Sequence, residues 1–276
     1  MSETIFKQEA CIKCGICSEV CPVGIINKPT AETFPVITAA NKKNCIQCGH
    51  CEAFCPNEAV ELKGPDLQKA AGSQKQTAIT PEQIGYYFPM RRSIRRYKQQ
   101  PVDRQTLEQL LAIVRYAPSG VNRQPVSWIV IYSTAELKKL TAMVIETMSQ
   151  MVKDKSPLAS MMNFQNMVSA WEQGGDFVCR QAPHLLIAHA RKDDRIAPLD
   201  ATIALTHFEL AAPAFGLGAC WAGYFSIIAN LSPAIRQAAG IPDDHVQLGS
   251  MLVGYPQYTP QRIPKRKHAT ILWRLG

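Results

Sequence analysis

From residue 80 onward, the pattern of apolar and polar positions predicts alternating helices and strands. A first helix is expected to begin at Thr80–Gln83, where the threonine can cap it, the proline fits its first turn and the glutamine completes a capping box. Asp103 is expected to cap a second helix, which ends before Pro118. One face of this helix carries an apolar stripe formed by Leu107, Leu110, Leu111 and Val114.

Further elements follow from apolar runs and cap signals along the same part of the chain. Ser133 and Glu136 form a second capping box and predict a helix. Another helix is predicted from Asp200 to about Phe215, bent at Pro213. The predicted strands are Val126–Tyr132, His184–Ala190, Val246–Val253 and Thr270–Arg274. The pattern therefore indicates a mixed α and β fold.

The segment Leu210–Ile235 carries no charge and is long enough to be tested as a membrane span. Prolines and glycines interrupt it, at Pro213, Gly216, Gly218, Gly223 and Pro233. It is better interpreted as a buried helix, a glycine turn and a following element. The chain opens Met-Ser-Glu-Thr without a basic start and an apolar run, so no secretory signal is expected. We therefore expect a cytoplasmic protein without a membrane span.

Eight of the ten cysteines lie in two identical strings with the spacing Cys-x2-Cys-x2-Cys-x3-Cys-Pro. In a cytosolic chain such short regular spacing indicates metal ligands rather than disulfides. The third cysteine of each string argues against zinc, which usually takes its ligands from separated pairs. The spacing is typical of bacterial two-cluster ferredoxins, in which the fourth cysteine ligates the other cluster. We therefore predict one [4Fe–4S] cluster on Cys11, Cys14, Cys17 and Cys55, and a second on Cys45, Cys48, Cys51 and Cys21.

This internal repeat predicts a pseudo-twofold ferredoxin-like module. Gly15 and Gly49 occupy the same place in the two loops, where the backbone must turn tightly. His50 either tunes the second cluster through a hydrogen bond or, as is more usual for a loop residue, faces solvent. Cys179 and Cys220 have no partner spacing and are expected to be buried core thiols.

The composition is that of a folded protein of 276 residues, with 46% hydrophobic and 19% charged residues. A polar stretch from Lys63 to Ala78 reads as a linker, so we predict domains at 1–62 and 80–276 joined by 63–79. Residues 1–62 carry 5 basic against 7 acidic residues, a charge of −2, so the rest of the chain carries +10 and the formal total is +8. Binding of nucleic acid by this basic part is the weaker interpretation, because a phosphate-bearing cofactor explains the same clusters.

Two basic clusters lie at opposite ends of the second domain. Arg91-Arg92-Ser93-Ile94-Arg95 places two guanidinium groups and a hydroxyl at alternate positions, which can converge on a phosphate, and Pro264–Lys267 is the second cluster. Each alone is more often a solvated patch. The small-residue run Gly216–Gly223 lets backbone approach a flat ligand closely. It is not a dinucleotide fingerprint, because Trp221 stands where a third glycine is needed.

Together with the segment Ala117–Pro125, these motifs resemble the FMN-dependent nitroreductase family in order and spacing, over roughly residues 80 to 276. The resemblance implies an α+β sandwich with a mainly antiparallel sheet, an intertwined homodimer and a C-terminal segment that reaches the partner subunit. It implies that the FMN phosphate and ribityl chain are held by Arg91, Ser93, Arg95, Lys265 and Lys267. It further implies contacts to FMN from the other subunit through Pro118, Ser119, Gly120, Asn122 and Gln124, and along the ring from Trp221, Ala222 and Gly223.

Two clusters ahead of a flavin predict an oxidoreductase that relays electrons between the clusters and FMN. The expected acceptor is a small molecule such as a nitroaromatic, a quinone or an activated alkene. The electron donor is open, with a ferredoxin or another redox protein as a candidate partner, and no residue is marked as a catalytic acid or base. The alternative is an electron-carrier module without small-substrate turnover. Six of the nine methionines lie between Met143 and Met167, which suits either a substrate lid or ordinary helix packing.

Overall fold

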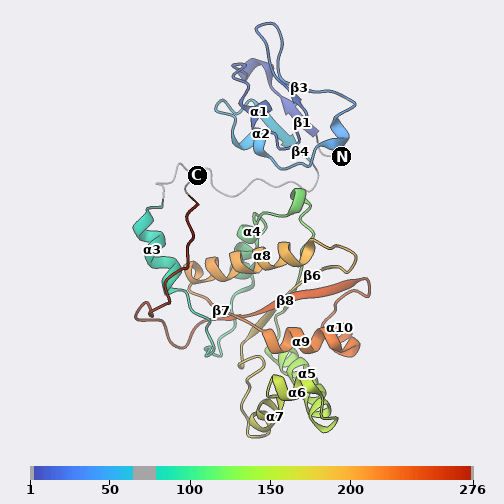
Figure 1. The fold of residues 1–276 in the computed structure, drawn as a ribbon, viewed down its shortest axis with the longest axis vertical. Helices are drawn as coiled ribbons and strands as arrows, with labels where there is room; N and C mark the ends of the chain where they lie inside the picture. The colour runs from blue at the N-terminus through green and yellow to red at the C-terminus, as the bar shows by residue number, and fades with distance from the viewer. Residues whose placement is uncertain (1–2, 65–78, 275–276) are drawn as a thin grey trace. The chain divides into compact units, whose positions relative to one another are not determined.

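The computed structural model describes residues 3–64 and 79–274 (Figure 1). The chain forms two compact units, Met1–Thr77 with Gly120–Arg123, and Ala78–Ser119 with Gln124–Gly276. Most of the predicted linker, residues 65–78, lies outside the described residues. Lys63 was expected to open that linker, but it is the last residue of a strand. The domain boundaries otherwise stay a prediction.

The first unit contains two small antiparallel sheets. β1 (Glu3–Phe6) pairs with β4 (Val60–Lys63), and β2 (Ile26–Asn27) pairs with β3 (Val36–Ile37). Two single-turn helices, α1 (Ile16–Glu19) and α2 (His50–Ala53), follow the two cysteine loops and contact each other. Short 3-10 turns lie at Gln8–Ala10 and Lys42–Asn44. The core beneath is small and is formed by Cys17, Ile25, Ile26, Ile37 and Val60.

The two halves of this unit repeat the same backbone turns. Gly15 and Gly49 both cap their helices with a positive φ, of 80° and 73°, as a glycine there permits. The residues two positions earlier, Lys13 and Gln47, share φ values of 57° and 54°. The third residue after each final cysteine is also left-handed, at Gly24 and Glu58. The sequence repeat is therefore a structural repeat, as the cysteine strings predict.

The second unit is built on a four-stranded sheet in the order β5-β6-β8-β7. All three strand pairs are antiparallel. The strands are β5 (Ser127–Ile131), β6 (His184–Arg191), β7 (Gly218–Trp221) and β8 (His245–Gly254). The predicted mainly antiparallel α+β fold is confirmed.

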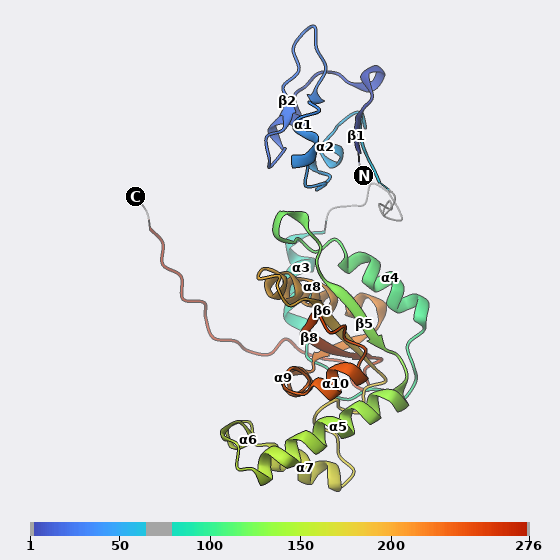
Figure 2. The same cartoon turned by 90° about the vertical axis from the view of Figure 1, so that its right-hand side faces the viewer.

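Helices cover both faces of this sheet (Figure 2). On one face α4 (Arg104–Val114) and α8 (Ala197–Ala211) pack on Leu186, Ala188, Met251 and Val253. On the other, α5 (Thr134–Lys153), α7 (Phe164–Glu172), α9 (Gly223–Leu231) and α10 (Pro233–Ala238) pack on Leu185, Ile187 and Leu252. The remaining helices are α3 (Pro81–Met90) and α6 (Pro157–Met161). Alternate residues of β6 thus enter two separate cores, so the strand is buried on both sides.

The predicted helix starts are confirmed by cap hydrogen bonds. At Thr80 both halves of the capping box are present, with Gln83 N donating to Thr80 Oγ1 over 3.2 Å and Thr80 N to Gln83 Oε1 over 2.9 Å. Asp103 caps α4 through Thr106 N, and Ser133 caps α5 through Glu136 N. Each bond satisfies one of the amides that a helix leaves unpaired at its start.

Three sequence expectations need correction. The helix expected at Asp200–Phe215 runs from Ala197 to Ala211 and gives way to a 3-10 turn at Ala212–Phe215, because Pro213 cannot continue the α-helical ladder. The expected strand Thr270–Arg274 is extended, but no strand of the described chain pairs with it. The glycine run was expected to be a turn throughout, yet Gly218–Trp221 is the edge strand β7, paired with β8.

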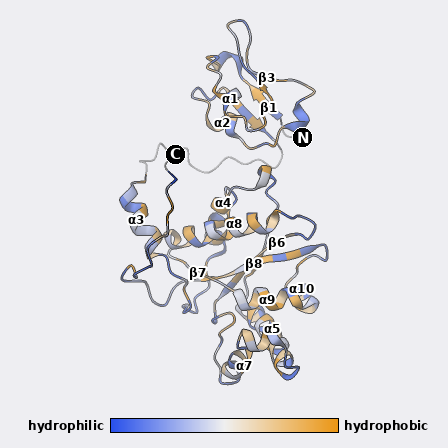
Figure 3. Ribbon diagram, viewed as in Figure 1, coloured by the Kyte–Doolittle hydropathy of each residue, from blue (hydrophilic) through white to orange (hydrophobic). Residues whose placement is uncertain are grey.

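Figure 3 shows that apolar residues are frequent on α5 and α9, the helices that cover the sheet. The six clustered methionines lie in this helical region, and Met148 is fully buried while Met143, Met151 and Met167 pack against the same core. Met161 is 75% exposed. Ordinary helix packing therefore accounts for most of them. Within the described residues, none of the helices has both the length and the apolar content that a membrane crossing requires.

Gly218 gives a direct test of the packing at the sheet edge. A Cβ atom there would lie 2.4 Å from Ile94 Cγ1, whereas one at Gly85 in α3 would meet nothing within 4 Å. We expect Gly218→Ala to lower the free energy of unfolding by about 1–3 kcal/mol through overpacking. Gly85→Ala is the control, expected to be neutral or stabilising by up to about 1 kcal/mol. Urea unfolding followed by circular dichroism measures both, and equal stabilities would contradict the packing argument.

Candidate functional site

Two cavities in the first unit are lined by the cysteines in crossed sets. One is lined by Cys11, Cys14, Cys17 and Cys55, and the other by Cys45, Cys48, Cys51 and Cys21. Each contains about 350 Å³ of empty space, part of it open to solvent. Each set combines three cysteines of one string with the last cysteine of the other, as the spacing predicts. The sulfur sets fit a [4Fe–4S] cube, although the ligation itself stays a prediction.

In residues 3–64 and 79–274, no group of three or more His, Cys, Asp or Glu side chains is close enough to hold one metal ion. Burial raises the pKa of the Cys51 thiol to about 11, and the like charges of the neighbouring cysteines add to that effect. Burial also raises the pKa of Cys17. Cluster binding must therefore displace thiol protons.

The surroundings of Cys55, His50, Cys179 and Cys220 agree with their predicted positions. Ala59 N donates to Cys55 Sγ over 3.2 Å, a type of bond that tunes cluster potentials. His50 is exposed and stacks on Phe54, with ring centroids 6.1 Å apart, in agreement with the solvent-facing interpretation. Cys179 and Cys220 are buried, at 1% and 5% exposure, as predicted.

The second unit holds a cavity beside the end of β7, with about 600 Å³ of empty space that is partly open. The segment before α4 runs along β7, because Ile94 N donates to Ala219 O over 2.9 Å and thereby sets Arg95 beside Trp221. Trp221 is the last residue of β7, and Ala222 caps α9. The lining consists of Arg95, Met162, Phe177, Val178, Arg180, Cys220, Trp221, Gly223, Tyr224, Ile227 and Leu252. We call this the Trp221 cavity.

Gly223 leaves room in the Trp221 cavity for a flat ligand. It opens α9, and a Cβ atom built on it would meet no atom within 4 Å apart from its chain neighbours and the backbone of its own helix. Ala222, by contrast, is buried in the core. The adjoining Gly218 serves packing against Ile94 instead. Of the three predicted ring contacts, Trp221 and Gly223 therefore line the cavity and the Ala222 side chain does not.

The predicted phosphate residues are only partly brought together. Arg91 Nη1 pairs with Glu209 Oε1 at 2.7 Å, so this guanidinium already has a carboxylate partner. The neighbouring Arg92 has a buried Nε atom with no hydrogen-bond partner in the described chain. Burial lowers the pKa of Arg92, and the like charges of Arg266 and Arg91 act in the same direction. An unpaired buried donor among cations fits a phosphate, although the sequence reasoning did not select Arg92.

The two C-terminal lysines lie on an exposed extended segment. Lys265 and Lys267 make no hydrogen bond or ion pair with the described part of the chain. Ser93 is partly buried at the start of the segment beside β7. The convergence of these lysines with Arg91 and Ser93 on one phosphate therefore stays a prediction.

The segment Pro118–Gln124 forms a strained loop. Val121, Asn122 and Gln124 have positive φ values of 46°, 55° and 49°, which L residues rarely adopt. Ser119 Oγ accepts from Gln124 N over 3.0 Å. Asn122 belongs to the first compact unit, where its amide donates to the carbonyl oxygens of Ile46 and Gln47. This segment is predicted to contact the FMN of the partner subunit, and those contacts stay a prediction for Pro118, Ser119, Gly120, Asn122 and Gln124.

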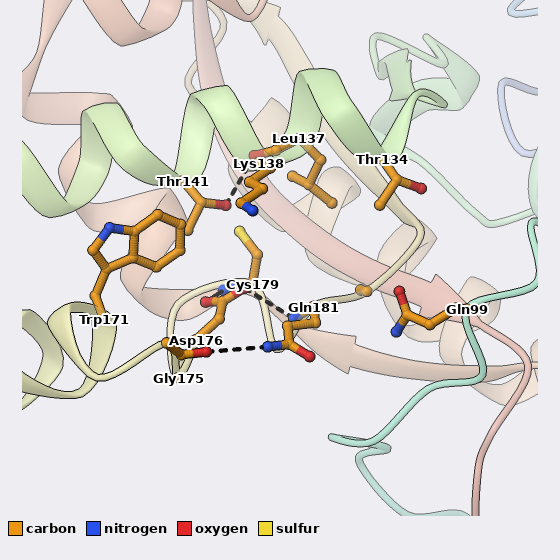
Figure 4. A pocket seen from close by; sticks show the side chains of 12 residues that line it. Gln99, Thr134, Leu137, Lys138, Thr141, Trp171, Gly175, Asp176, Cys179 and Gln181 are labelled. Carbon is orange, nitrogen blue, oxygen red and sulfur yellow. Dashed lines mark hydrogen bonds between the residues drawn. The ribbon is translucent and has the colours of Figure 1, made fainter.

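A second and larger cavity lies beneath α5, lined by Thr134, Lys138 and Thr141 from the helix and by Trp171, Asp176, Cys179 and Gln181 from the opposite side (Figure 4). It contains about 1090 Å³ of empty space, including open solvent. Burial raises the pKa of the Cys179 thiol well above its ordinary value. Cys179 is therefore a buried core thiol whose protonated form is favoured.

Sequence reasoning missed Phe177, Arg180 and Tyr224 in the Trp221 cavity. Tyr224 follows the glycine run directly and could have been found by extending that motif. Phe177 and Arg180 belong to a loop with no motif, before the buried strand β6. The only sequence feature that could have drawn attention to them is the position of Arg180, three residues before Pro183, which precedes the apolar run of β6.

Comparison with protein-family models assigns both parts of the chain. Residues 90–255 match the nitroreductase family, and residues 10–60 match a 4Fe-4S dicluster domain. A relative from Methanothermobacter thermautotrophicus, with the provisional name NADH dehydrogenase/NAD(P)H nitroreductase, is 25% identical over 62% of this chain and 75% of its own length. A relative of the same name from Archaeoglobus fulgidus is 26% identical over 64% of this chain and 94% of its own length.

Solved structures show the same fold. A nitroreductase with bound FMN from Bacteroides fragilis has a TM-score of 0.56 at 22% identity, covering 69% of this chain and 98% of its own. Iodotyrosine deiodinase bound to FMN and 3-iodo-L-tyrosine has a TM-score of 0.52 at 17% identity, covering 69% and 98%. The second unit thus has the architecture of nitroreductase-like oxidoreductases. The chain belongs to the nitroreductase family and carries an N-terminal 4Fe-4S dicluster domain.

The crossed cysteine sets predict a specific pattern of losses. Cys21→Ser is expected to remove the cluster shared with Cys45, so the double variant with Cys45→Ser should lose no more iron than either single variant. Combining Cys21→Ser with Cys11→Ser should instead remove both clusters, because Cys11 lines the other cavity. Iron content and low-temperature electron paramagnetic resonance measure this, and Cys179→Ala is the control that keeps all iron. Additive losses for Cys21 and Cys45 would show that the ligands are not crossed.

Proposed function

We propose that this protein is an iron–sulfur flavoprotein oxidoreductase that relays electrons between two [4Fe–4S] clusters and FMN and reduces a small oxidised acceptor. Nitroaromatics, quinones and activated alkenes are the acceptor classes that a flat site beside an aromatic residue suits. FMN, when bound, exchanges electrons singly with the clusters and in pairs with the acceptor.

The proposal is supported by the presence of cluster-sized cysteine cavities and a flavin-sized cavity in one chain. The same chain contains two cavities lined by four cysteines each and, in the second unit, a cavity flanked by cations and opened by Gly223. Membership of the nitroreductase family supports FMN as the occupant, as do FMN-bound structures of the same fold. The residues we assign to the phosphate and ribityl chain are Arg91, Ser93, Arg95, Lys265 and Lys267, with Arg92 added from its unpaired Nε. Trp221 and Gly223 would face the ring.

The cavity walls determine how protons reach the site. Among its described lining residues there is no His, Asp or Glu. Burial raises the pKa of Cys220, and the thiol donates to Trp221 O over 3.6 Å, so it is a poor acid near neutral pH. We therefore assign proton delivery to water entering through the open side of the cavity, and the apolar walls restrict how much water enters.

The enzyme is favoured over an electron-carrier module by the open, partly apolar Trp221 cavity, which a carrier with a sealed flavin would not need. Anaerobic titration of the purified protein with NADH, NADPH and reduced ferredoxin tests the relay, with flavin and cluster absorption followed separately. Reoxidation by a nitroaromatic in turnover amounts is the expected result. Reoxidation only by a protein acceptor would support the carrier instead.

The phosphate assignment predicts weaker FMN binding without loss of iron. Since charge-assisted hydrogen bonds contribute about 1.5–3 kcal/mol each, Lys265→Ala should raise the Kd for FMN roughly tenfold to a hundredfold. Because Arg91 is paired with Glu209, the matched variant is Arg91→Gln with Glu209→Gln, which avoids leaving a lone carboxylate. Fluorescence titration measures both. Binding of riboflavin should not change, and Lys139→Ala on the exposed face of α5 is the control.

Assembly as a homodimer is proposed because large apolar side chains remain exposed on the C-terminal segment, namely Ile263, Ile271, Leu272 and Trp273. If a partner subunit covers them and completes the FMN site, dimerisation and FMN binding stabilise each other. Leu272→Asp with Trp273→Asp should therefore give monomers that release FMN, measured by light scattering and filtration. Met161→Asp, an equally exposed apolar position on α6, is the control. A flavin-loaded monomer would contradict the shared site.

A further inference from the structure

The loop between α7 and β6 separates the cavity beneath α5 from the Trp221 cavity. Phe177, Val178 and Arg180 line the Trp221 cavity. Asp176, Cys179 and Gln181 line the cavity beneath α5, and Figure 4 shows these three side chains on that side. Residues 176–181 thus form a wall between the two cavities that consists of a single stretch of backbone. This wall presents the Arg180 side chain to the proposed flavin site.

This wall is held in a strained shape. Asp176 Oδ1 accepts from Val178 N and Cys179 N at 2.9 and 2.8 Å, and Oδ2 accepts from Gln181 N at 2.9 Å. Arg180 and Gln181 have φ values of 58° and 52°, in the left-handed region that disfavours side chains. Such strain persists only where surrounding contacts enforce it, and it is frequent at ligand sites. The Asp176 bonds therefore fix the backbone in the conformation that presents Arg180.

Arg180 has no acidic partner in this position. Both oxygens of Asp176 are engaged by backbone amides, and Glu209 pairs with Arg91. Within the described residues Arg180 makes no hydrogen bond or ion pair, and its guanidinium lies 4.9 Å from the centroid of the Phe177 ring. Burial lowers the pKa of Arg180 and the nearby cation Arg95 lowers it further, against smaller opposing effects of Cys220, Asp176 and Tyr224.

A partly buried guanidinium without a counter-ion is costly unless a ligand supplies the charge. The cavity around it provides aromatic walls from Phe177, Trp221 and Tyr224, and a guanidinium binds a carboxylate through two parallel hydrogen bonds. The described residues lining the cavity include no acid that would repel an anion.

We propose that Arg180 binds the carboxylate of an aromatic or conjugated acceptor in the Trp221 cavity and so makes the protein selective for anionic acceptors. This inference rests on the proposed function, because the acceptor is the molecule that FMN would reduce. Arg180 is a specificity residue here. Its guanidinium donates hydrogen bonds to the acceptor's carboxylate, forms no covalent bond and transfers no proton, so it sets the affinity and the orientation of the acceptor.

The test compares matched acceptors with and without a carboxylate. In the FMN-loaded full-length protein, Arg180→Met should lower kcat/KM for 4-nitrobenzoate roughly tenfold to a hundredfold, the loss expected for a charge-assisted pair, and leave nitrobenzene within threefold. Arg180→Lys should recover part of the loss. Arg104→Met, which removes an exposed arginine on α4, is the control. Iron and FMN content confirm that each variant is folded.

A binding measurement separates this proposal from the catalytic one. Benzoate, which cannot be reduced, should bind the parent protein, and its Kd should be higher by the same factor in Arg180→Met. Benzamide should bind the parent and the variant with equal affinity. If the parent reduces no nitroaromatic but benzoate binding still depends on Arg180, the proposed function fails and the anion site stands. If the parent is active and Arg180→Met slows both acceptors equally while shifting the FMN midpoint potential, the charge serves the flavin and the anionic-acceptor proposal is overturned. Unchanged selectivity and benzoate binding would overturn it as well.

Discussion

The burial of β6 on both faces is the constraint on which the second unit depends. His184–Arg191 lies within the sheet, with its side chains divided between two cores, so helices must cover both sides. The strand β8 pairs with β6 from His245 to Val253, with one bulge, and carries β7 at the sheet edge. β7 then delivers Trp221 to the cavity, while the chain entering β6 delivers Arg180. Gly254 faces Pro183 at this entry, where a Cβ atom would lie 2.6 Å from the proline ring. The cavity thus lies where β7 ends and where the chain enters β6, the two strands that flank β8.

The first unit obtains its order differently, because its apolar core is small for a chain of that length. Cys17 is itself a core residue, and Cys21, Cys45, Cys51 and Cys55 pack against the same cluster. Metal ligation and folding are therefore linked in this unit, since the side chains that would bind the clusters also form the hydrophobic interior. The repeated left-handed turns at Gly15 and Gly49 show that both halves solve one geometric problem, which is to wrap a short loop around a large group.

Local signals made much of this architecture predictable. Thr80, Asp103 and Ser133 mark helix starts through cap hydrogen bonds that involve only a few neighbouring residues, and the strands β5, β6 and β8 are rich in apolar residues. The cysteine strings predicted the crossed lining of two cavities because their spacing is that of bacterial two-cluster ferredoxins, in which the fourth cysteine ligates the other cluster. β7 was missed because Gly218 and Ala219 have little intrinsic strand preference, and its pairing with β8 supplies the structure instead. The strand prediction for Thr270–Arg274 was wrong for the opposite reason. Its residues favour a strand, but no strand of the described chain pairs with them. Arg180 could not be found from sequence, because its role follows from a backbone conformation that no local motif encodes.

Because residues 176–181 line both the cavity beneath α5 and the Trp221 cavity, changes in this loop during evolution affect both cavities. Its side chains are divided between the cavity beneath α5 (Asp176, Cys179, Gln181) and the Trp221 cavity (Phe177, Val178, Arg180), and Asp176 stabilises this division by accepting hydrogen bonds from backbone amides. Point substitutions can therefore alter either cavity alone as long as Asp176 remains. Insertion or deletion of one residue would reassign the side chains on both sides at once. Relatives that differ in the length of this loop should accordingly differ in both cavities together, and loop length is a better guide than residue identity to where acceptor preference has diverged.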